Sequence, residues 1–225
     1  MYSLIFLLLG IGISMWASYN VKAKFNKYAQ VPYSKNVTAE IVANWILKQA
    51  NISNVRIERG SGMLTDHYDP QSKVLRLSDS VYGSNSVAAI GVAAHECGHA
   101  IQDATMYQPL ITRRKLVPAC NIGSKVSMPM ILLGIILGAT GLINIGIILF
   151  SLVVLFQLVT LPVEFDASKR ACNILESSGR FNDSEISGIK AVLQAAAITY
   201  LASALNSLLQ LLRLLSLEKG RIRRW

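Results

Sequence analysis

The chain has few charged residues for its length. Of its 225 residues, 16% are charged and 52% are hydrophobic, with a mean hydropathy of +0.41. This balance argues against an ordinary soluble domain and predicts a membrane protein with a small soluble portion. We therefore expect the lipid bilayer to be its main surroundings.

Acidic residues are scarcer than basic ones, 13 against 22, which gives a formal charge of +9. An excess of this size can indicate a nucleic-acid partner. Here the basic residues lie beside apolar stretches and do not alternate with aromatic residues, so anionic lipid headgroups explain them better. We expect no nucleic-acid binding.

Cysteine is also rare, with only Cys97, Cys120 and Cys172 in the chain. No two of them are spaced as C-x-x-C, and an odd number leaves at least one thiol unpaired. This favours a reducing compartment on the side where they lie.

Histidine occurs only three times, yet two of the three form the H-E-x-x-H motif His95-Glu96-Cys97-Gly98-His99. The run from 87 to 104 predicts one helix, on which residues four apart share a face, so both imidazoles can reach one Zn²⁺ while Glu96 lies beside its open side. Two surface histidines are the alternative, but residues 87–94 are too apolar for an exposed helix face.

The other chemically active residues near the motif have simpler interpretations. Cys97 is two residues from each histidine and so points about 200° around the helix from both, which favours a small core residue over a ligand or a nucleophile. His67 lies in a turn-forming context, Thr65 to Pro70, so we expect it in an exposed loop and do not place it on the metal.

The N-terminal residues 1–19 are apolar, with no charge before Lys22. A secretory signal carries its basic residues before the apolar core, so we interpret this segment as a retained transmembrane anchor. Basic residues follow the anchor and also precede the next apolar region, at 113–115, which predicts that residues 20–117 face the cytoplasm and that the N-terminus faces outward.

Residues 20–117 form the predicted catalytic portion. Thr38 to Gln49 has the pattern of an amphipathic helix, and Val55–Arg59 and Lys73–Ser78 alternate as strands do. The order is helix, small sheet, then the H-E-x-x-H helix. The strand at Val74 to Ser78 is either a sheet edge that pairs with an extended peptide or an interior strand.

Residues 118–161 are predicted to form a transmembrane hairpin. One helix over 128–161 would be about 51 Å long, well beyond a hydrocarbon core of about 30 Å, so two helices joined near Gly138–Gly141 fit better. The hairpin matters because Glu164, in the following segment 162–187, is the conspicuous candidate for a third ligand. An even number of crossings returns it to the side of His95 and His99.

Residues 188–217 predict a hydrophobic helix that carries a polar stripe, which could face the hairpin, line a substrate groove or touch headgroups. Its members are Thr199, Ser203, Asn206, Gln210 and Arg213. We expect the helix to span the membrane because it exceeds 20 residues and intramembrane polar groups usually face a bundle interior. Spanning places the basic tail 218–225 outside, against the charge rule, whereas an interfacial helix would keep it cytoplasmic.

These motifs support a named resemblance. The segment 93–102 around the H-E-x-x-H motif, the apolar hairpin, the segment 156–168 with Glu164, and the closing Ala- and Leu-rich helix resemble the YugP-like family of bacterial membrane zinc metallopeptidases. The resemblance implies a multi-pass plasma-membrane protein and a neutral endopeptidase of the gluzincin type. It assigns His95, His99 and Glu164 as ligands of one Zn²⁺ and Glu96 as the catalytic base.

The chain departs from the larger, related group of membrane zinc proteases at one position. In that group an aspartate usually follows the glutamate ligand by four residues, and here Ser168 stands there. Asp166 lies about 200° around the helix from Glu164, and Asp103 lies four residues past His99. Either could orient an imidazole or be a plain surface carboxylate, so both stay outside the predicted site.

The sequence thus predicts a mainly α, membrane-embedded, zincin-like fold with a small β-sheet. The expected activity is hydrolysis of peptide bonds in membrane or membrane-proximal proteins, by zinc-activated water with Glu96 as base. The residue that donates a second hydrogen bond to the oxyanion is not assigned among Tyr82, Tyr107 and Tyr200. Whether the chain forms a homo-oligomer also stays open. The rival functions are a catalytically silent membrane scaffold and a small metal-linked transporter.

Overall fold

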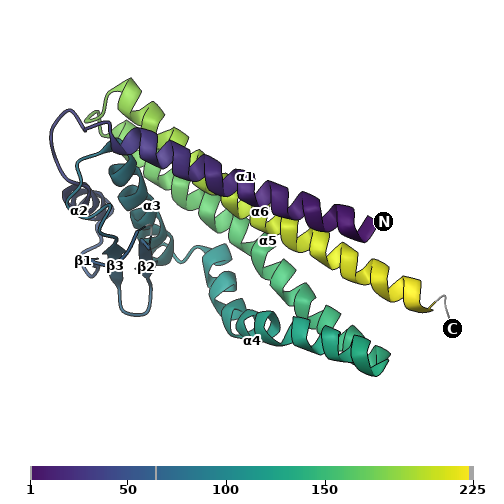
Figure 1. Ribbon diagram of the computed structural model, residues 1–225. Coiled ribbons are helices and arrows are strands. Elements are labelled where there is room, and N and C mark those ends of the chain that lie inside the picture. The colour runs from purple at the N-terminus through teal and green to yellow at the C-terminus, as the bar shows by residue number, and fades with distance from the viewer. Residues whose placement is uncertain (1, 64, 223–225) are drawn as a thin grey trace. The chain divides into compact units, whose positions relative to one another are not determined.

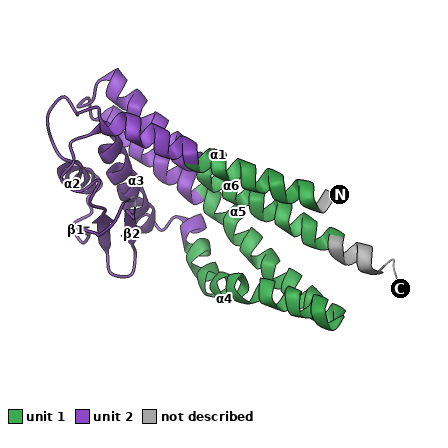
Figure 2. Cartoon of the chain, viewed as in Figure 1, with its two compact units in different colours: residues 1–18, 111–162, 199–225 green, residues 19–110, 163–198 purple. Residues whose placement is uncertain are grey.

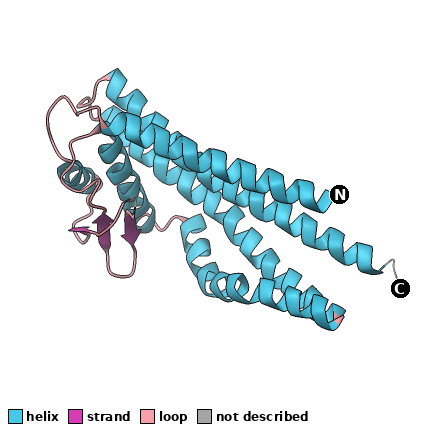
Figure 3. Cartoon of the chain, in the orientation of Figure 1, coloured by secondary structure: helices cyan, strands magenta, loops and turns pink. Residues whose placement is uncertain are grey.

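The computed structural model describes residues 2–63 and 65–222, and the side chains of 4–63 and 65–216 (Figure 1). Long helices dominate it, and the strands form one small sheet (Figure 3). In chain order the elements are α1 (Tyr2–Ala29), α2 (Ala39–Gln49), β1 (Arg56–Arg59), β2 (His67–Asp69), β3 (Val74–Leu77), α3 (Val87–Ala104), α4 (Gln108–Leu137), α5 (Thr140–Ser177) and α6 (Asp183–Ile222). The expected mainly α fold with a small sheet is confirmed.

Among the described residues, four helices are long and apolar enough to cross a membrane: α1, α4, α5 and α6. Their apolar side chains are largely exposed, as expected of surfaces that face lipid; Leu4 is 60% and Ile136 78% exposed. Length and composition fit the bilayer well, because a span needs about 20 apolar residues.

The turn between α4 and α5 falls where the hairpin was predicted. Gly138 ends α4 with φ +68°, a left-handed conformation that glycine adopts without steric cost, and the Ala139 N–H donates to the Gly134 carbonyl at 2.9 Å. The flanking helices are longer than predicted. α4 begins ten residues before position 118, and α5 continues through Pro162 to Ser177, so the third-ligand segment starts as a continuation of the hairpin helix.

The chain divides into two compact units, one comprising residues 1–18, 111–162 and 199–225 and the other residues 19–110 and 163–198 (Figure 2). Within the first, Ile131, Ile143, Ile147 and Leu214 form a small buried cluster. α4 bends in Figure 1, and the interior prolines Pro118 and Pro129 give the bend a cause.

The polar stripe of α6 makes a contact that the sequence did not predict. A Cβ built on Gly10 of α1 would overlap the Asn206 side chain, so at this position the stripe faces α1. Elsewhere its members bond along their own helix: Ser203 Oγ donates to the Thr199 carbonyl, and Arg213 donates to Gln210 Oε1. A larger residue at position 10 would force the Asn206 side chain to move.

The second unit holds the sheet, whose strand order is β1-β3-β2. β1 runs parallel to β3, with Arg56 opposite Val74, and β2 runs antiparallel to it, with Tyr68 opposite Leu75. The idea that Val74–Ser78 forms a sheet edge is wrong, because β3 has a partner on each side and Leu75 is fully buried.

The turn predicted around His67 is also corrected, since His67–Asp69 forms the edge strand β2. Three residues are too few for alternation to be visible in the sequence. His67 itself is exposed, as expected, and its Nδ1 lies 2.8 Å from the Thr65 carbonyl.

α3 packs into the core of this unit beside α2 and the sheet (Figure 1). Ser86 caps its N-terminus by accepting a hydrogen bond from the Ala89 N–H at 3.2 Å. The first two turns are buried, including Ala88, Ala89 and Ile90 at 0% exposure. The apolar run before the H-E-x-x-H motif therefore anchors the helix, and the motif's position is fixed from its N-terminal side.

Candidate metal centre

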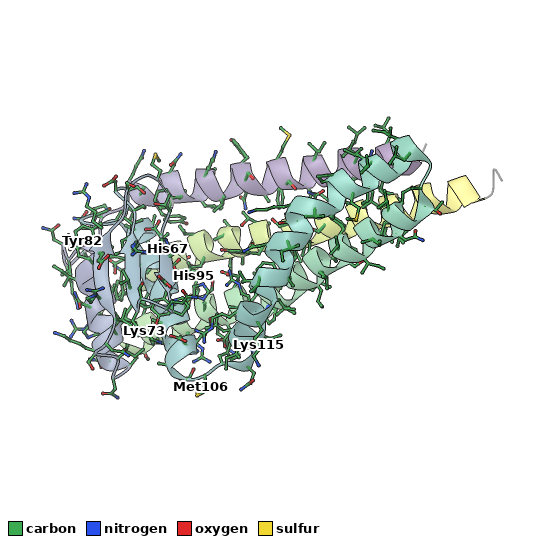
Figure 4. All side chains as sticks on the ribbon, turned by 90° about the horizontal axis from the view of Figure 1, so that it is seen from below. His67, Lys73, Tyr82, His95, Met106 and Lys115 are labelled. Carbon is green, nitrogen blue, oxygen red and sulfur yellow. The ribbon has the colours of Figure 1, made fainter. Side chains whose placement is uncertain are left out.

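Two elements of the second unit bring the predicted ligands together. His95 and His99 lie on one face of α3, and Glu164 lies on α5. Glu164 Oε2 is 3.2 Å from His95 Nε2 and 3.5 Å from His99 Nε2. One donor atom from each side chain lies within 4.8 Å of the others, which is the spacing of a single-cation site. Figure 4 shows His95 on its helix.

Small residues allow the two helices to approach closely enough. A Cβ on Gly98 would lie 2.9 Å from the carbonyl carbon of Ala167, a contact tighter than side chains tolerate. Ala167 and Val163 are fully buried on the facing side of α5. The glycine in the motif therefore lets α5 approach α3 closely enough for the Glu164 carboxylate to reach the two imidazoles.

The three side chains are largely removed from solvent. The Glu164 side chain is 3% exposed and each imidazole 12%. Burial by itself would lower the pKa of His99, but the hydrogen bond to Glu164, the nearby charges of Glu96 and Glu164 and the bond to Gln102 outweigh it and raise that pKa. Buried carboxylates require a compensating positive charge, which a proton on the imidazole or a bound cation supplies.

Each imidazole is also held from behind. His95 Nδ1 lies 3.0 Å from Ser168 Oγ, and His99 Nδ1 lies 3.0 Å from Gln102 Oε1. Both rings therefore direct Nε2 towards Glu164. Sequence reasoning identified Ser168 only as the place of a missing aspartate and did not identify Gln102. Their spacing was the available signal, since Ser168 follows Glu164 by four residues and Gln102 follows His99 by three.

The two carboxylates left outside the predicted site have different surroundings. Asp166 Oδ2 accepts hydrogen bonds from Gln102 Nε2 at 2.8 Å and from Arg170 Nε at 2.6 Å. It therefore connects to His99 through Gln102. Asp103 accepts from Tyr68 OH at 2.8 Å and from Lys73 Nζ at 2.5 Å, so it joins α3 to the sheet.

The remaining motif residues occupy the interior. Glu96 is 7% exposed, and its charge contributes to the raised pKa of His99. Cys97 is fully buried, its Sγ points to the Ala43 carbonyl on α2 at 3.6 Å, and burial raises its pKa. The thiol is a core group, as the helical spacing predicted.

Of the tyrosines considered as oxyanion donors, Tyr82 packs against the hydrophobic core, and the Tyr107 ring lies under the Arg170 guanidinium at 5.4 Å. Tyr200 belongs to the other unit. We assign the role to none of them.

The chain resembles known proteins over most of its length. Residues 3–219 match the model of a family described as "Putative neutral zinc metallopeptidase". The chain belongs to this family. It is also 47% identical over 203 residues to "Putative membrane protease YugP" of Bacillus subtilis (strain 168). The matched residues make up 90% of each protein. No solved structure matches the chain. The resemblance seen in the motifs is thus confirmed at the level of the family.

The family description implies zinc, and the residues present fit that metal. Two imidazole nitrogens and one carboxylate oxygen are a common protein ligand set of catalytic zinc, which leaves a coordination position free. The hydrogen bonds at both Nδ1 atoms are the usual support of such histidines.

Proposed function

We propose that this protein is a membrane-bound zinc endopeptidase that cleaves membrane or membrane-proximal proteins. The observation that carries the proposal is the convergence of His95, His99 and Glu164, with Glu96 next to the first ligand on the same buried helix. Each of the residue types needed for this chemistry is present in one unit of the fold.

In this proposal His95 Nε2, His99 Nε2 and a Glu164 oxygen hold one Zn²⁺. The zinc ion, when bound, acidifies a water molecule and polarises the carbonyl of the scissile peptide. The chain's own contribution is to present three fixed donors and to keep the surroundings dry, because the ligand side chains are at most 12% exposed.

Glu96 is the group that moves the proton. Its carboxylate accepts a proton from the attacking water and then passes it to the amine nitrogen that leaves as the peptide bond breaks. Its burial strengthens the electrostatic effect of that carboxylate on its neighbours.

We further propose a multi-pass arrangement in which α1, α4, α5 and α6 cross the membrane and the unit with the metal centre faces the cytoplasm. The basic residues Lys22, Lys24 and Lys27 follow the apolar part of α1, as the positive-inside tendency requires of a cytoplasmic flank. Tethering the site at the bilayer raises its effective concentration towards other membrane proteins, which supports them as substrates.

The test is a comparison of purified wild-type protein with Glu96→Gln, Glu164→Ala and, as a control, Glu58→Gln on β1. The zinc content is measured by elemental analysis. The rate of peptide-bond hydrolysis is measured with unfolded membrane proteins as substrates. We expect one zinc per chain in the wild type and Glu96→Gln, and loss of hydrolysis by at least about 100-fold in Glu96→Gln. Glu164→Ala should lose both zinc binding and hydrolysis, whereas Glu58→Gln should keep both.

The outcomes separate the rival functions. Zinc-loaded Glu96→Gln that cleaves at the wild-type rate would contradict the role of Glu96 as base. Wild-type protein without zinc or hydrolysis would favour the membrane scaffold. Metal flux into vesicles without hydrolysis would favour the transporter.

A further inference from the structure

Gln102 is the most deeply buried polar side chain in contact with a candidate ligand, with 0% of its surface exposed. Its Nε2 donates to the Val163 carbonyl at 2.7 Å and to Asp166 Oδ2 at 2.8 Å. Both partners only accept hydrogen bonds, so they consume the two protons of the amide nitrogen. The amide can therefore have only one orientation, with Oε1 towards His99.

That orientation decides which nitrogen of His99 carries the proton. Oε1 is an acceptor with no hydrogen to give, and it lies 3.0 Å from His99 Nδ1. Nδ1 must be the protonated nitrogen, and in the neutral ring Nε2 is then left with a free lone pair. Nε2 is the atom that faces Glu164.

The outer members of the network keep the amide in place. Arg170 Nε donates to Asp166 Oδ2 at 2.6 Å, and Arg170 also lies 3.4 Å from Thr105 Oγ1 and above the Tyr107 ring. The guanidinium neutralises the charge of Asp166 and fixes the carboxylate. Asp166 is thus close to Glu164 in the sequence, but it contacts Gln102 and not an imidazole. Gln102 in turn contacts the His99 ring.

His95 has a different kind of support. Its Nδ1 faces Ser168 Oγ, and a hydroxyl can donate or accept. Ser168 therefore permits either tautomer of His95, whereas Gln102 permits only one of His99. The two candidate ligands are unequal in how strictly they are oriented.

We infer that Gln102, itself oriented by Asp166 and Val163, is a positioning residue that holds His99 as the Nδ1-protonated tautomer with Nε2 directed at the cation. This inference rests on the proposed function, because it concerns the same metal centre. It assigns Asp166 and Arg170 an indirect role that acts through Gln102.

The first experiment measures zinc affinity by chelator competition for the full chain in lipid nanodiscs. Gln102→Met keeps the length of the side chain and removes both its donor and its acceptor. We expect zinc affinity to fall by about 10- to 100-fold, the usual effect of losing such a support. Gln49→Met, at the exposed end of α2, is the matched control and should bind zinc as the wild type does.

A double-variant cycle then tests the path through the amide. Asp166→Ala alone should weaken zinc binding less than Gln102→Met, since the Val163 carbonyl still orients the amide. In the Gln102→Met background, Asp166→Ala should have no further effect. A direct effect of the Asp166 charge on the cation would instead give the same loss in both backgrounds, and that result would overturn the assigned path.

A spectroscopic readout observes the tautomer itself. The chain has three histidines, so selective ¹⁵N-histidine labelling gives a spectrum that can be fully assigned. In the zinc-loaded wild type, His99 should show a protonated Nδ1 that exchanges slowly with water, and Asp166→Ala should accelerate that exchange. This comparison remains decisive if Gln102→Met does not fold.

Failure of the inference is distinguishable from failure of the proposed function. Wild-type protein that binds no zinc would remove the proposed function and the inference together. Wild-type and Gln102→Met proteins that bind zinc equally well, or a zinc-loaded wild type whose His99 is protonated at Nε2, would overturn the inference alone.

Discussion

At the scale of single residues, the candidate centre is characterised by the groups behind its imidazoles. Ser168 and Gln102 are neutral, whereas a carboxylate is a common partner of zinc-binding histidines. A carboxylate behind the ring raises the basicity of the ligand nitrogen. Neutral partners would leave the imidazoles weaker donors, so a metal bound in the proposed way would keep more of its power to polarise bound groups.

Ser168→Asp tests this difference. The new carboxylate would lie behind His95 Nδ1, where the hydroxyl lies now, and should raise zinc affinity by up to about tenfold. Chelator competition measures the change. Ser177→Asp, at the exposed end of the same helix, adds the same charge away from the centre. Equal affinities for these two variants would show that the partner of His95 does not tune the ligand.

The sequence was sufficient to name the residues that converge at the candidate centre but not those that contact the imidazoles from behind. His95, Glu96 and His99 are visible because helical spacing is local, and Glu164 because it follows the apolar hairpin. The Gln102 network depends on how α3 meets α5, and no local pattern records the register between two helices. The sequence showed Ser168 only as a departure from the aspartate usual at that position in the larger protease group. It did not show that the hydroxyl contacts His95.

At the scale of elements, the approach of α3 to α5 controls the centre. Gly98 lies where the two backbones are closest. The strand β2 was missed for a related reason, since a three-residue edge strand acquires its identity from pairing with β3 and not from its own sequence. The long apolar helices, in contrast, were predictable because their length and composition are sufficient.

Gly98→Ala should separate the helices. The added Cβ would overlap the Ala167 carbonyl group, with its carbon 2.9 Å away, and this backbone cannot move aside as a side chain can. We therefore expect a destabilisation of about 1–3 kcal/mol and loss of zinc binding. Thermal unfolding with and without zinc measures both effects. Gly12→Ala on α1 is the control, because nothing lies within 4 Å of its Cβ. Identical unfolding and zinc content of the two variants would contradict this view of the packing.

At the scale of the whole molecule, the proposed membrane arrangement rests on four apolar helices and a basic flank. With α1, α4, α5 and α6 all spanning, the segments on the proposed cytoplasmic side include the sheet, α3 and the start of α6. The turn between α4 and α5 would lie on the opposite side.

Cysteine labelling tests that arrangement. In a variant whose native cysteines are replaced, Thr140→Cys at the α4–α5 turn should react with a membrane-impermeant maleimide in intact cells. Ser61→Cys in the loop before β2 should react only after the membrane is opened. Both side chains are exposed, so burial does not explain a difference. Labelling of Ser61→Cys in intact cells would reverse the proposed orientation.

The burial of Cys97 has a consequence for the durability of the centre. Sulfur chemistry proceeds through the thiolate, and a thiol enclosed against α2 with a raised pKa stays protonated and out of reach of oxidants and alkylating agents. The middle of the motif therefore carries a reactive element in an inert form. In the proposed peptidase this thiol would stay unmodified under peroxide stress, so nitrogen and oxygen would remain the donors of the centre.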